Sequence, residues 1–139
     1  CLVGSEMCIR DRLHLEDKVQ FLGSRTDVPQ LLQAADLFVH PATCQEGFGI
    51  TLIEAMASGV PCLAFPKGAI PEIIGPEIDG FLTEEVSAAA LTAGINRALE
   101  LFTKAPHHWH TLCKNARQKA ELFSIERTVA QLETLYREQ

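Results

Sequence analysis

The chain has 139 residues, of which 47% are hydrophobic and 22% are charged, and this composition fits one folded domain with a substantial core. Its 18 acidic and 12 basic side chains give a formal net charge of −6, which argues against nucleic acid as a partner bound through general basic charge. No apolar run reaches the roughly 20 residues of a membrane-spanning helix. We therefore expect a cytoplasmic protein.

Cysteines and histidines give no sign of a disulfide framework or a metal site. The cysteines are odd in number and contain no C-x-x-C pair, so we expect reduced thiols. Three histidines lie close together, but no cysteine or carboxylate stands at a supporting spacing. We expect a solvated helix start there and no metal. The histidines are His107, His108 and His110; the cysteines are Cys1, Cys8, Cys44, Cys62 and Cys113.

The first twelve residues differ from the rest of the chain. Residues 1–12 show neither helical nor strand periodicity, whereas the sequence from Leu13 onward is locally consistent. We expect residues 1–12 to be a non-native or disordered tail and residues 13–139 to be the folded domain.

Strands and helices are predicted to alternate along that domain. Residues 19–23 are typical of a short strand, and Asp27 is placed to cap a helix with Pro29 in its first turn. Residues 37–40 form an apolar run stopped by Pro41, which is typical of a strand buried on both faces of a parallel sheet.

The same order of elements then repeats. Gly59 is placed to end one helix, and Pro106 separates two longer ones. The further helices are predicted at residues 51–58, 71–74, 86–101, 108–123 and 124–137, and the further strands at 60–65 and 80–82. The alternation predicts an α/β fold, a Rossmann-like doubly wound parallel sheet. Ligands bind such sheets at the carboxyl ends of the strands, which directs attention to the loops 41–49 and 66–69.

The first of these loops has the features of a nucleotide-sugar site. Gly47 and Gly49 lack a Cβ, so the backbone can bend and approach a ligand closely. The helix that follows directs its free N–H groups at the same place, where a diphosphate is the natural occupant. Thr51 and Glu54 also match a capping box, which is a purely structural explanation for Glu54. A capping box does not explain Glu46, the two glycines or an exposed Phe48.

Residues 19–82 resemble the C-terminal domain of the retaining GT-B glycosyltransferases with two glutamates separated by seven residues (glycosyltransferase family 4, glycosyl transferases group 1). Glu46 and Glu54 have that separation. The other landmarks stand in the family's order: residues 21–23, 25–29, 34–36, 40–42, 46–49, 54–61, 72–74 and 79–82. The resemblance implies a partial C-terminal domain of a GT-B fold.

The resemblance also implies a role for individual residues. Glu46 would be the catalytic group, beside the transferred sugar and the positive charge at its anomeric carbon. Glu54 would bind the ribose hydroxyls, and Thr51 with the helix N-terminus would hold the leaving diphosphate. Arg25 would lie near the nucleobase, with a solvated arginine as the alternative. The sugar and distal phosphate would meet the backbone of Gly47, Phe48, Gly49 and Ile50.

The implied reaction is transfer of a sugar from a nucleotide-diphosphate donor to a hydroxyl acceptor with the anomeric configuration retained. Front-face attack is the family-level expectation. The sequence has no Asp-x-Asp metal motif, and the resemblance implies neither a divalent metal nor another cofactor. Donor sugar, nucleobase and acceptor remain open.

The chain departs from the family pattern before Leu13. The arginine and lysine that grip the donor phosphates in the family are not found there, nor are the first strands of the domain or the N-terminal domain, which supplies most of the acceptor site. We expect the chain alone to be inactive and to have an open sheet edge. The missing N-terminal domain would be its partner, would receive the last helix and would carry any peripheral attachment to the inner face of the membrane.

Two other functions remain open from the sequence. One is a GT-B relative that performs epimerisation or phosphorolysis with the same donor. The other is a degenerate or stand-alone nucleotide-binding module that has lost catalysis. Intact Glu46, Gly47, Gly49 and Glu54 favour the transferase.

Overall fold

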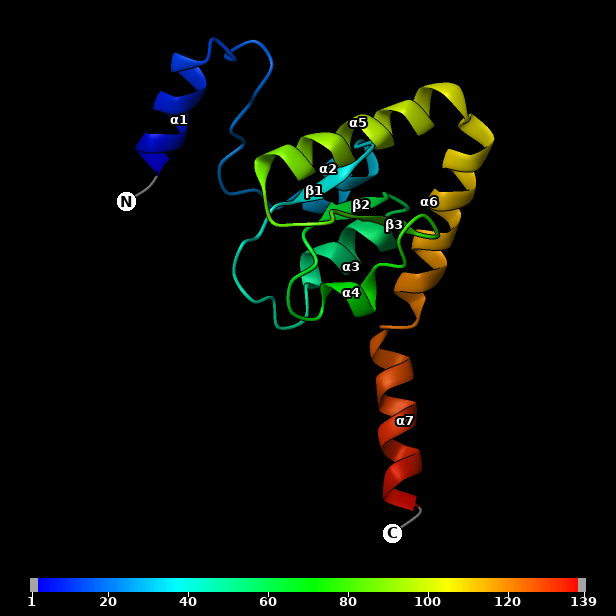
Figure 1. Cartoon of the computed structure of the whole chain (residues 1–139). Coiled ribbons are helices and arrows are strands. Elements are labelled where there is room, and N and C mark those ends of the chain that lie inside the picture. The colour runs from blue at the N-terminus through cyan, green and yellow to red at the C-terminus, as the bar shows by residue number, and fades with distance from the viewer. Residues whose placement is uncertain (1–2, 138–139) are drawn as a thin grey trace.

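The structure, a computed structural model, describes residues 3–137 and has an α/β architecture around a three-stranded parallel sheet (Figure 1). The strands lie in the order β1-β2-β3, with the register Phe38↔Cys62↔Gly80, Val39↔Leu63↔Phe81 and His40↔Ala64↔Leu82. All three strands therefore end at the same edge. In chain order the elements are α1 (Val3–Arg12), α2 (Val28–Gln33), β1 (Phe38–His40), α3 (Ile50–Ala57), β2 (Cys62–Ala64), α4 (Ile70–Ile73), β3 (Gly80–Leu82), α5 (Ala88–Lys104), α6 (Pro106–Glu121) and α7 (Ile125–Arg137).

Helices cover both faces of the sheet, which confirms the doubly wound prediction. Successive strand side chains point to opposite faces, so Leu63 and its neighbours on β2 enter different cores. Leu63 and Phe81 pack against α5 and the first half of α6, through Ala98, Trp109 and Leu112. Cys62 and Ala64 pack against the other core, which contains Leu32, Leu52, Ala55, Met56, Ile70, Ile73, Ala116 and Ala120. Helix α6 thus contributes to both cores.

Burial distinguishes the central strand β2 from β1, one of the two edge strands. All of β2 is buried, whereas β1 is only partly buried along its length. The strand predicted at residues 37–40 is confirmed, but its predicted burial on both faces is wrong because β1 lies at the edge of the sheet. The helix at residues 51–58 is confirmed as α3, and Gly59 ends it with φ of +80°.

Three local predictions are corrected. Residues 19–23 form no strand, and Val19, Phe21 and Leu22 are exposed, since no neighbouring strand pairs with them. Asp27 stands at the N-cap of α2, but its carboxylate makes no capping hydrogen bond. Residues 3–12 form a helix, because local helical hydrogen bonding does not require an amphipathic pattern. Cys1 and Leu2 lie outside the described residues, and the non-native origin of the tail stays a prediction.

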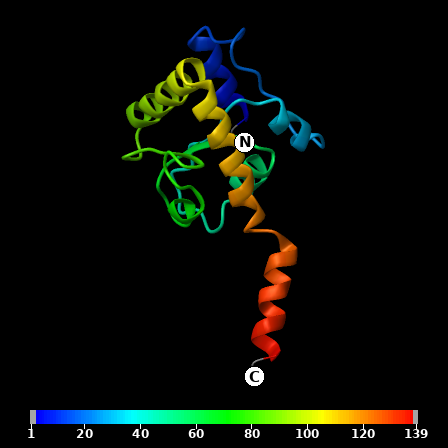
Figure 2. The same cartoon turned by 90° about the vertical axis from the view of Figure 1, so that its right-hand side faces the viewer.

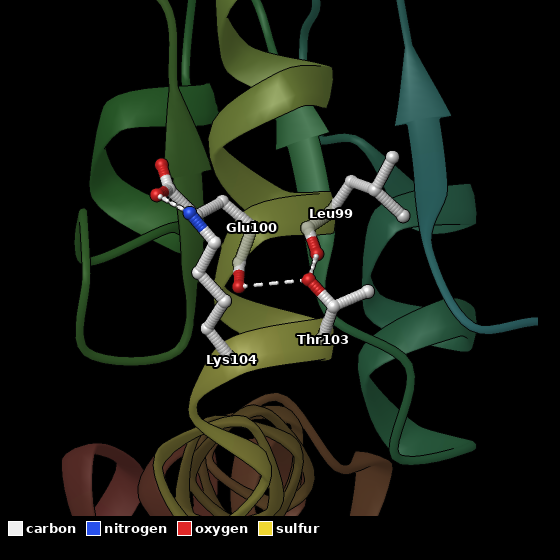
Figure 3. Close-up of polar contacts among 4 residues, drawn as sticks. All are labelled: Leu99, Glu100, Thr103 and Lys104. Carbon is white, nitrogen blue, oxygen red and sulfur yellow. Dashed lines mark hydrogen bonds and ion pairs between the residues drawn. The ribbon is translucent and has the colours of Figure 1, made fainter.

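Side-chain hydrogen bonds lie at both ends of α5, the longest helix described. Ser87 caps α5, because its hydroxyl accepts a hydrogen bond from the Ala90 N–H at 3.1 Å. At the other end of α5, the Thr103 hydroxyl donates to the carbonyls of Leu99 and Glu100 at 2.8 and 3.2 Å, and Lys104 Nζ lies 2.7 Å from Glu100 Oε1 (Figure 3). Lys104 lowers the pKa of Glu100, but this exposed pair adds little stability.

Helix α7 leaves the body of the molecule after the turn that follows α6 (Figures 1 and 2). None of its residues is buried. Its apolar side chains, which the sequence predicted for contact with another domain, are exposed: Val129, Leu132, Leu135 and Tyr136. Within residues 3–137, no helix is both long enough and apolar enough to cross a membrane.

Candidate functional site

The loops that follow β1 and β2 meet at the carboxyl edge of the sheet, as the sequence predicts. The Ala69 N–H donates to the Glu46 carbonyl oxygen at 3.1 Å. Gly68 lies against the same peptide with φ of +56°, and a Cβ at this position would lie 2.1 Å from the Glu46 carbonyl oxygen. Only glycine fits here, because both the backbone conformation and the space exclude a side chain. The second loop therefore holds the backbone of Glu46 in place.

The Glu46 side chain is held as well. Its Oε1 accepts a hydrogen bond from the Gly49 N–H at 3.1 Å, and its Oε2 lies 3.5 Å from His40 Nε2. The side chain of Glu46 is 29% exposed, so part of it still faces solvent. His40 is the last residue of β1, and its Nε2 is buried without a hydrogen-bond partner. The sheet edge, the loop and the helix start thus converge on one carboxylate.

Helix α3 begins in a different way from the predicted capping box. Its N-cap is Gly49, in the left-handed conformation with φ of +74°, and Thr51 lies inside the first turn. The capping box between Thr51 and Glu54 is therefore wrong. Gly49 needs its conformational freedom here, and a Cβ would come within 3.1 Å of Leu52.

The start of α3 leaves backbone donors free. Among the residues that the structure describes, no hydrogen bond uses the N–H groups of Ile50 or Thr51. Both residues are exposed. The positive end of the α3 dipole is at the same place. This helix start can therefore accept an anion.

Glu54 lies apart from these contacts, on the exposed side of α3. It borders a groove of about 340 Å³ between α2 and α3, together with Val28, Pro29, Leu32, Ala57 and Ser58. Its side chain has no hydrogen-bond or ion-pair partner within the described part of the chain. A carboxylate beside an apolar groove can accept hydrogen bonds from a bound hydroxyl-bearing ligand.

The other two loop residues that the sequence singles out behave differently from each other. Gly47 has no positive φ, and a Cβ built on it meets no atom within 4 Å, so the fold itself does not require a glycine there. The ring of Phe48 is half exposed and contacts Phe123 edge to face, with centroids 6.0 Å apart. The structure thus places one surface of Phe48 against the turn after α6.

Arg25 lies before α2 and is paired with Asp27. Its guanidinium donates to both carboxylate oxygens of Asp27, at 2.7 and 2.5 Å. This pair raises the pKa of Arg25 and lowers the pKa of Asp27. Both side chains are well exposed, so solvent screens the pair.

Three site residues escaped prediction as functional residues. His40 was noted as a strand end and as part of the family landmark 40–42, without a role of its own, and Gly68 only as part of a loop. Lys67 is half buried and is the one lysine or arginine in the loops 41–49 and 66–69. It forms no ion pair among the described residues. A signal for all three was their position at the end of a predicted strand or just after one, since parallel strands end at one edge.

The described cysteines differ in burial, and one of them lies in the Glu46 loop. Burial raises the pKa of the Cys62 thiol to about 12, and burial also raises that of Cys113. Cys44 is exposed in the Glu46 loop. Within residues 3–137, no three His, Cys, Asp or Glu side chains lie together as a metal site would require. His107, His108 and His110 are on α6.

The parallel sheet, the glycine-shaped loop and the free helix start form an α/β domain, and its family and solved relatives show that it is of the GT-B type. Residues 4–119 match the family Glycosyl transferases group 1, and the chain belongs to this family. The match begins at residue 4, inside the segment 1–12 that the sequence predicts to be a non-native or disordered tail.

Known relatives support the assignment. The N-acetyl-alpha-D-glucosaminyl L-malate synthase of Bacillus anthracis is 36% identical over 96% of this chain and 35% of its own length. The sucrose-phosphate synthase of Thermosynechococcus elongatus superposes with a TM-score of 0.84 at 32% identity, over 97% of this chain and 33% of the other. Anabaena HepE in complex with UDP gives a TM-score of 0.78 at 33% identity, over 95% of this chain and 36% of the other. The chain spans about a third of the length of these relatives.

Proposed function

We propose that this chain forms the donor-nucleotide part of a retaining glycosyltransferase of the Glu-x7-Glu type, family 4. The complete enzyme would move a sugar from a nucleotide-diphosphate donor to a hydroxyl acceptor. The observation that carries the proposal is the fixed Glu46 carboxylate beside the free N–H groups that begin α3. A sugar diphosphate has a group for each: hydroxyls for the carboxylate and an anion for the helix start.

Glu46 is the proposed catalytic residue. As a carboxylate it only accepts hydrogen bonds, and among the described residues only the Gly49 N–H donates one to it, which leaves acceptor sites for a ligand. It can therefore accept from sugar hydroxyls and favour positive charge at the anomeric carbon. Because its backbone and side chain are already held, little reorganisation is needed when that charge develops.

The diphosphate is proposed to lie at the start of α3. The N–H groups of Ile50 and Thr51 are free, and the Thr51 hydroxyl adds a donor. Lys67, on the loop after β2, is the one basic side chain in the two site loops. It can offset part of the phosphate charge. The backbone of Gly47, Phe48 and Gly49 would face the sugar and distal phosphate. The open space over Gly47 fits close approach of a ligand. These groups would act without a divalent metal.

The nucleoside is proposed to occupy the groove between α2 and α3. Glu54 would accept hydrogen bonds from the ribose hydroxyls, and the apolar side chains of Val28 and Leu32 would contact the base or ribose. Arg25 borders this region in sequence, and its guanidinium must leave Asp27 before it can serve the base. Anabaena HepE has been solved with UDP and with UDP-glucose, which supports a uridine nucleotide as the first donor to test.

The experiment is a calorimetric titration of the chain with UDP. Glu54→Ala should weaken UDP binding at least about tenfold, since each hydrogen bond to a charged group contributes roughly 1.5–3 kcal/mol. Glu126→Ala, which removes an exposed glutamate from α7, is the matched control and should bind UDP as the wild type does. Equal affinity in all three proteins would refute the role of Glu54.

Sugar transfer tests the second part of the proposal. The chain alone should not transfer glucose from UDP-glucose, because the relatives supply about two thirds of their length from elsewhere. Transfer above an equally treated Glu46→Ala sample would refute the inactivity. The alternative function, a nucleotide-binding module without catalysis, gives a different result in a longer polypeptide. A polypeptide as long as the relatives that contains this chain would then bind UDP but transfer no sugar.

A further inference from the structure

The Glu46 loop touches the turn between α6 and α7 through one aromatic contact. We define the donor loop as residues 46–49. The rings of Phe48 and Phe123 meet edge to face, 6.0 Å between centroids and 77° between planes. This arrangement is a favoured one for aromatic pairs. Residues about 75 positions apart in sequence are thereby joined.

Phe48 lies between two glycines in an exposed part of the loop. Gly47 before it has open space where a side chain would lie, and Gly49 after it is in the left-handed conformation. Its ring is half exposed. A large side chain between two glycines can adopt many positions unless a neighbour fixes it. Phe123 is that neighbour among the aromatic residues that the structure describes.

Phe123 is itself firmly placed. It is partly buried and packs against the core that contains Leu52, Ile73 and Ala120. Its N–H donates to the Ala120 carbonyl at 3.0 Å, which closes the turn after α6. The position of Phe123 is therefore set by α6 and the core, and the ring of Phe48 lies against this placed ring.

We propose that Phe123 is a positioning residue of the donor loop, acting through Phe48 on the bond between the Gly49 N–H and Glu46. This inference rests on the proposed function for its consequence in donor binding, but the loop effect itself needs no ligand. The turn between α6 and α7 then forms part of the wall that orders the site. Phe48 serves the donor through its backbone, while its ring serves the loop.

The first test measures hydrogen exchange of the Gly49 N–H in the ligand-free chain. Phe123→Leu keeps an apolar side chain but removes the ring, and should speed this exchange about three- to tenfold, the range expected for loss of an aromatic pair. Phe123→Tyr keeps the ring and should exchange as the wild type does. Phe102→Leu is the control, because Phe102 makes a similar edge-to-face contact with Trp109 in the other core.

A double-mutant cycle makes the test independent of a general loss of stability. Phe48→Leu and Phe123→Leu should each speed Gly49 exchange, and the double variant should exchange no faster than the faster single variant. The proposal would be overturned if the acceleration of Gly49 exchange in the double variant equalled the product of the two single accelerations. Unchanged exchange in Phe123→Leu, or an equal change in Phe102→Leu, would also overturn it.

UDP affinity supplies the consequence for the site. Phe123→Leu should weaken UDP binding about three- to tenfold. Phe123→Tyr, which keeps the ring, should bind UDP as the wild type does. If the wild-type chain does not bind UDP, the proposed function fails, while the exchange cycle still decides the role of Phe123. If UDP binds and Phe123→Leu changes neither exchange nor affinity, only the role of Phe123 fails.

Discussion

Glu46 and Glu54 stand eight positions apart in the sequence, yet the protein holds them very differently. Glu46 contacts the Gly49 N–H, approaches His40 and has its peptide fixed by Gly68 and Ala69. Glu54 lies on the exposed side of α3 beside an apolar groove and has no described partner. One carboxylate is fixed before any ligand arrives, and the other is free to bind one.

The difference teaches how a single short helix can serve two tasks. Helix α3 carries Glu54 in its second turn and begins at Gly49, whose N–H binds Glu46. A residue that stabilises developing charge benefits from a fixed position, whereas a residue that binds hydroxyls must keep its acceptor sites free. Both roles require α3 to stay packed against the sheet.

Thiol labelling tests whether α3 stays packed against the sheet, and we expect the difference in labelling rate to be the largest of the predicted effects. Cys62 lies under α3, where its Sγ is 3.6 Å from the Leu52 carbonyl oxygen, and burial raises its pKa to about 12. At pH 8 it should react at least about 100-fold more slowly with iodoacetamide than exposed Cys44, because the thiolate is the reactive form. Mass spectrometry of the labelled peptides measures both rates. Comparable rates would show that α3 leaves the sheet readily.

Gly68→Ala tests the contact that fixes the Glu46 backbone. The added Cβ would lie 2.1 Å from the Glu46 carbonyl oxygen, at a residue with φ of +56°. We expect a loss of about 2–4 kcal/mol in the free energy of unfolding, from strain and overlap together. Denaturant unfolding measures it.

Gly47→Ala is the matched control in the neighbouring loop, since its Cβ would meet no atom within 4 Å. It should change stability by no more than about 0.5 kcal/mol. If Gly68→Ala were as stable as Gly47→Ala, the second loop would not hold Glu46.

Replacing each glutamate by alanine sharpens the comparison directly. Glu46→Ala removes the acceptor for the Gly49 N–H and should lower the free energy of unfolding by about 1 kcal/mol. Glu54→Ala removes an exposed side chain and should change it by less than about 0.5 kcal/mol. Chemical denaturation of the two variants measures both free energies of unfolding. Equal losses in the two variants would remove the distinction between a fixed and a free carboxylate.

The smallest expected effect concerns the residues that precede α2. Arg25 lowers the pKa of Asp27 in the folded chain, so this contribution to stability is present above the ordinary aspartate value of about 4. It is lost as the pH falls through the lowered pKa. Arg25→Ala should return the pKa of Asp27 toward its ordinary value, as a carboxyl NMR titration would record. Arg97→Ala, which breaks a different exposed pair with Glu77, should leave Asp27 unchanged.

The sequence predicted the sheet and the site loops because their signals are local. Apolar runs ended by proline predicted β1 and β2, a short apolar segment after a turn predicted β3, and helical spacing predicted α5, α6 and α7. The parallel register then brought the two loops together at one edge. The family landmarks directed attention to the same residues.

What failed depends on contacts between distant residues. A strand at 19–23 needs a neighbour, which the described chain does not provide. The capping box was a correct local pattern, but Glu46 instead bonds the Gly49 N–H and moves the helix start. Likewise, nothing near Gly68 in sequence shows that Glu46 will occupy the space of its missing side chain.

The central claim is that the Glu46 loop, the start of α3 and the Glu54 groove form one donor site. An NMR titration of the nitrogen-15-labelled chain with UDP tests it most directly. The account predicts that amide shifts concentrate in residues 46–54 and 67–69, with smaller changes along α2. Shifts concentrated instead around the separate pocket between β3 and α5, lined by Thr83, Glu85 and Arg97, would contradict it. Absence of any shift at millimolar UDP would contradict it equally.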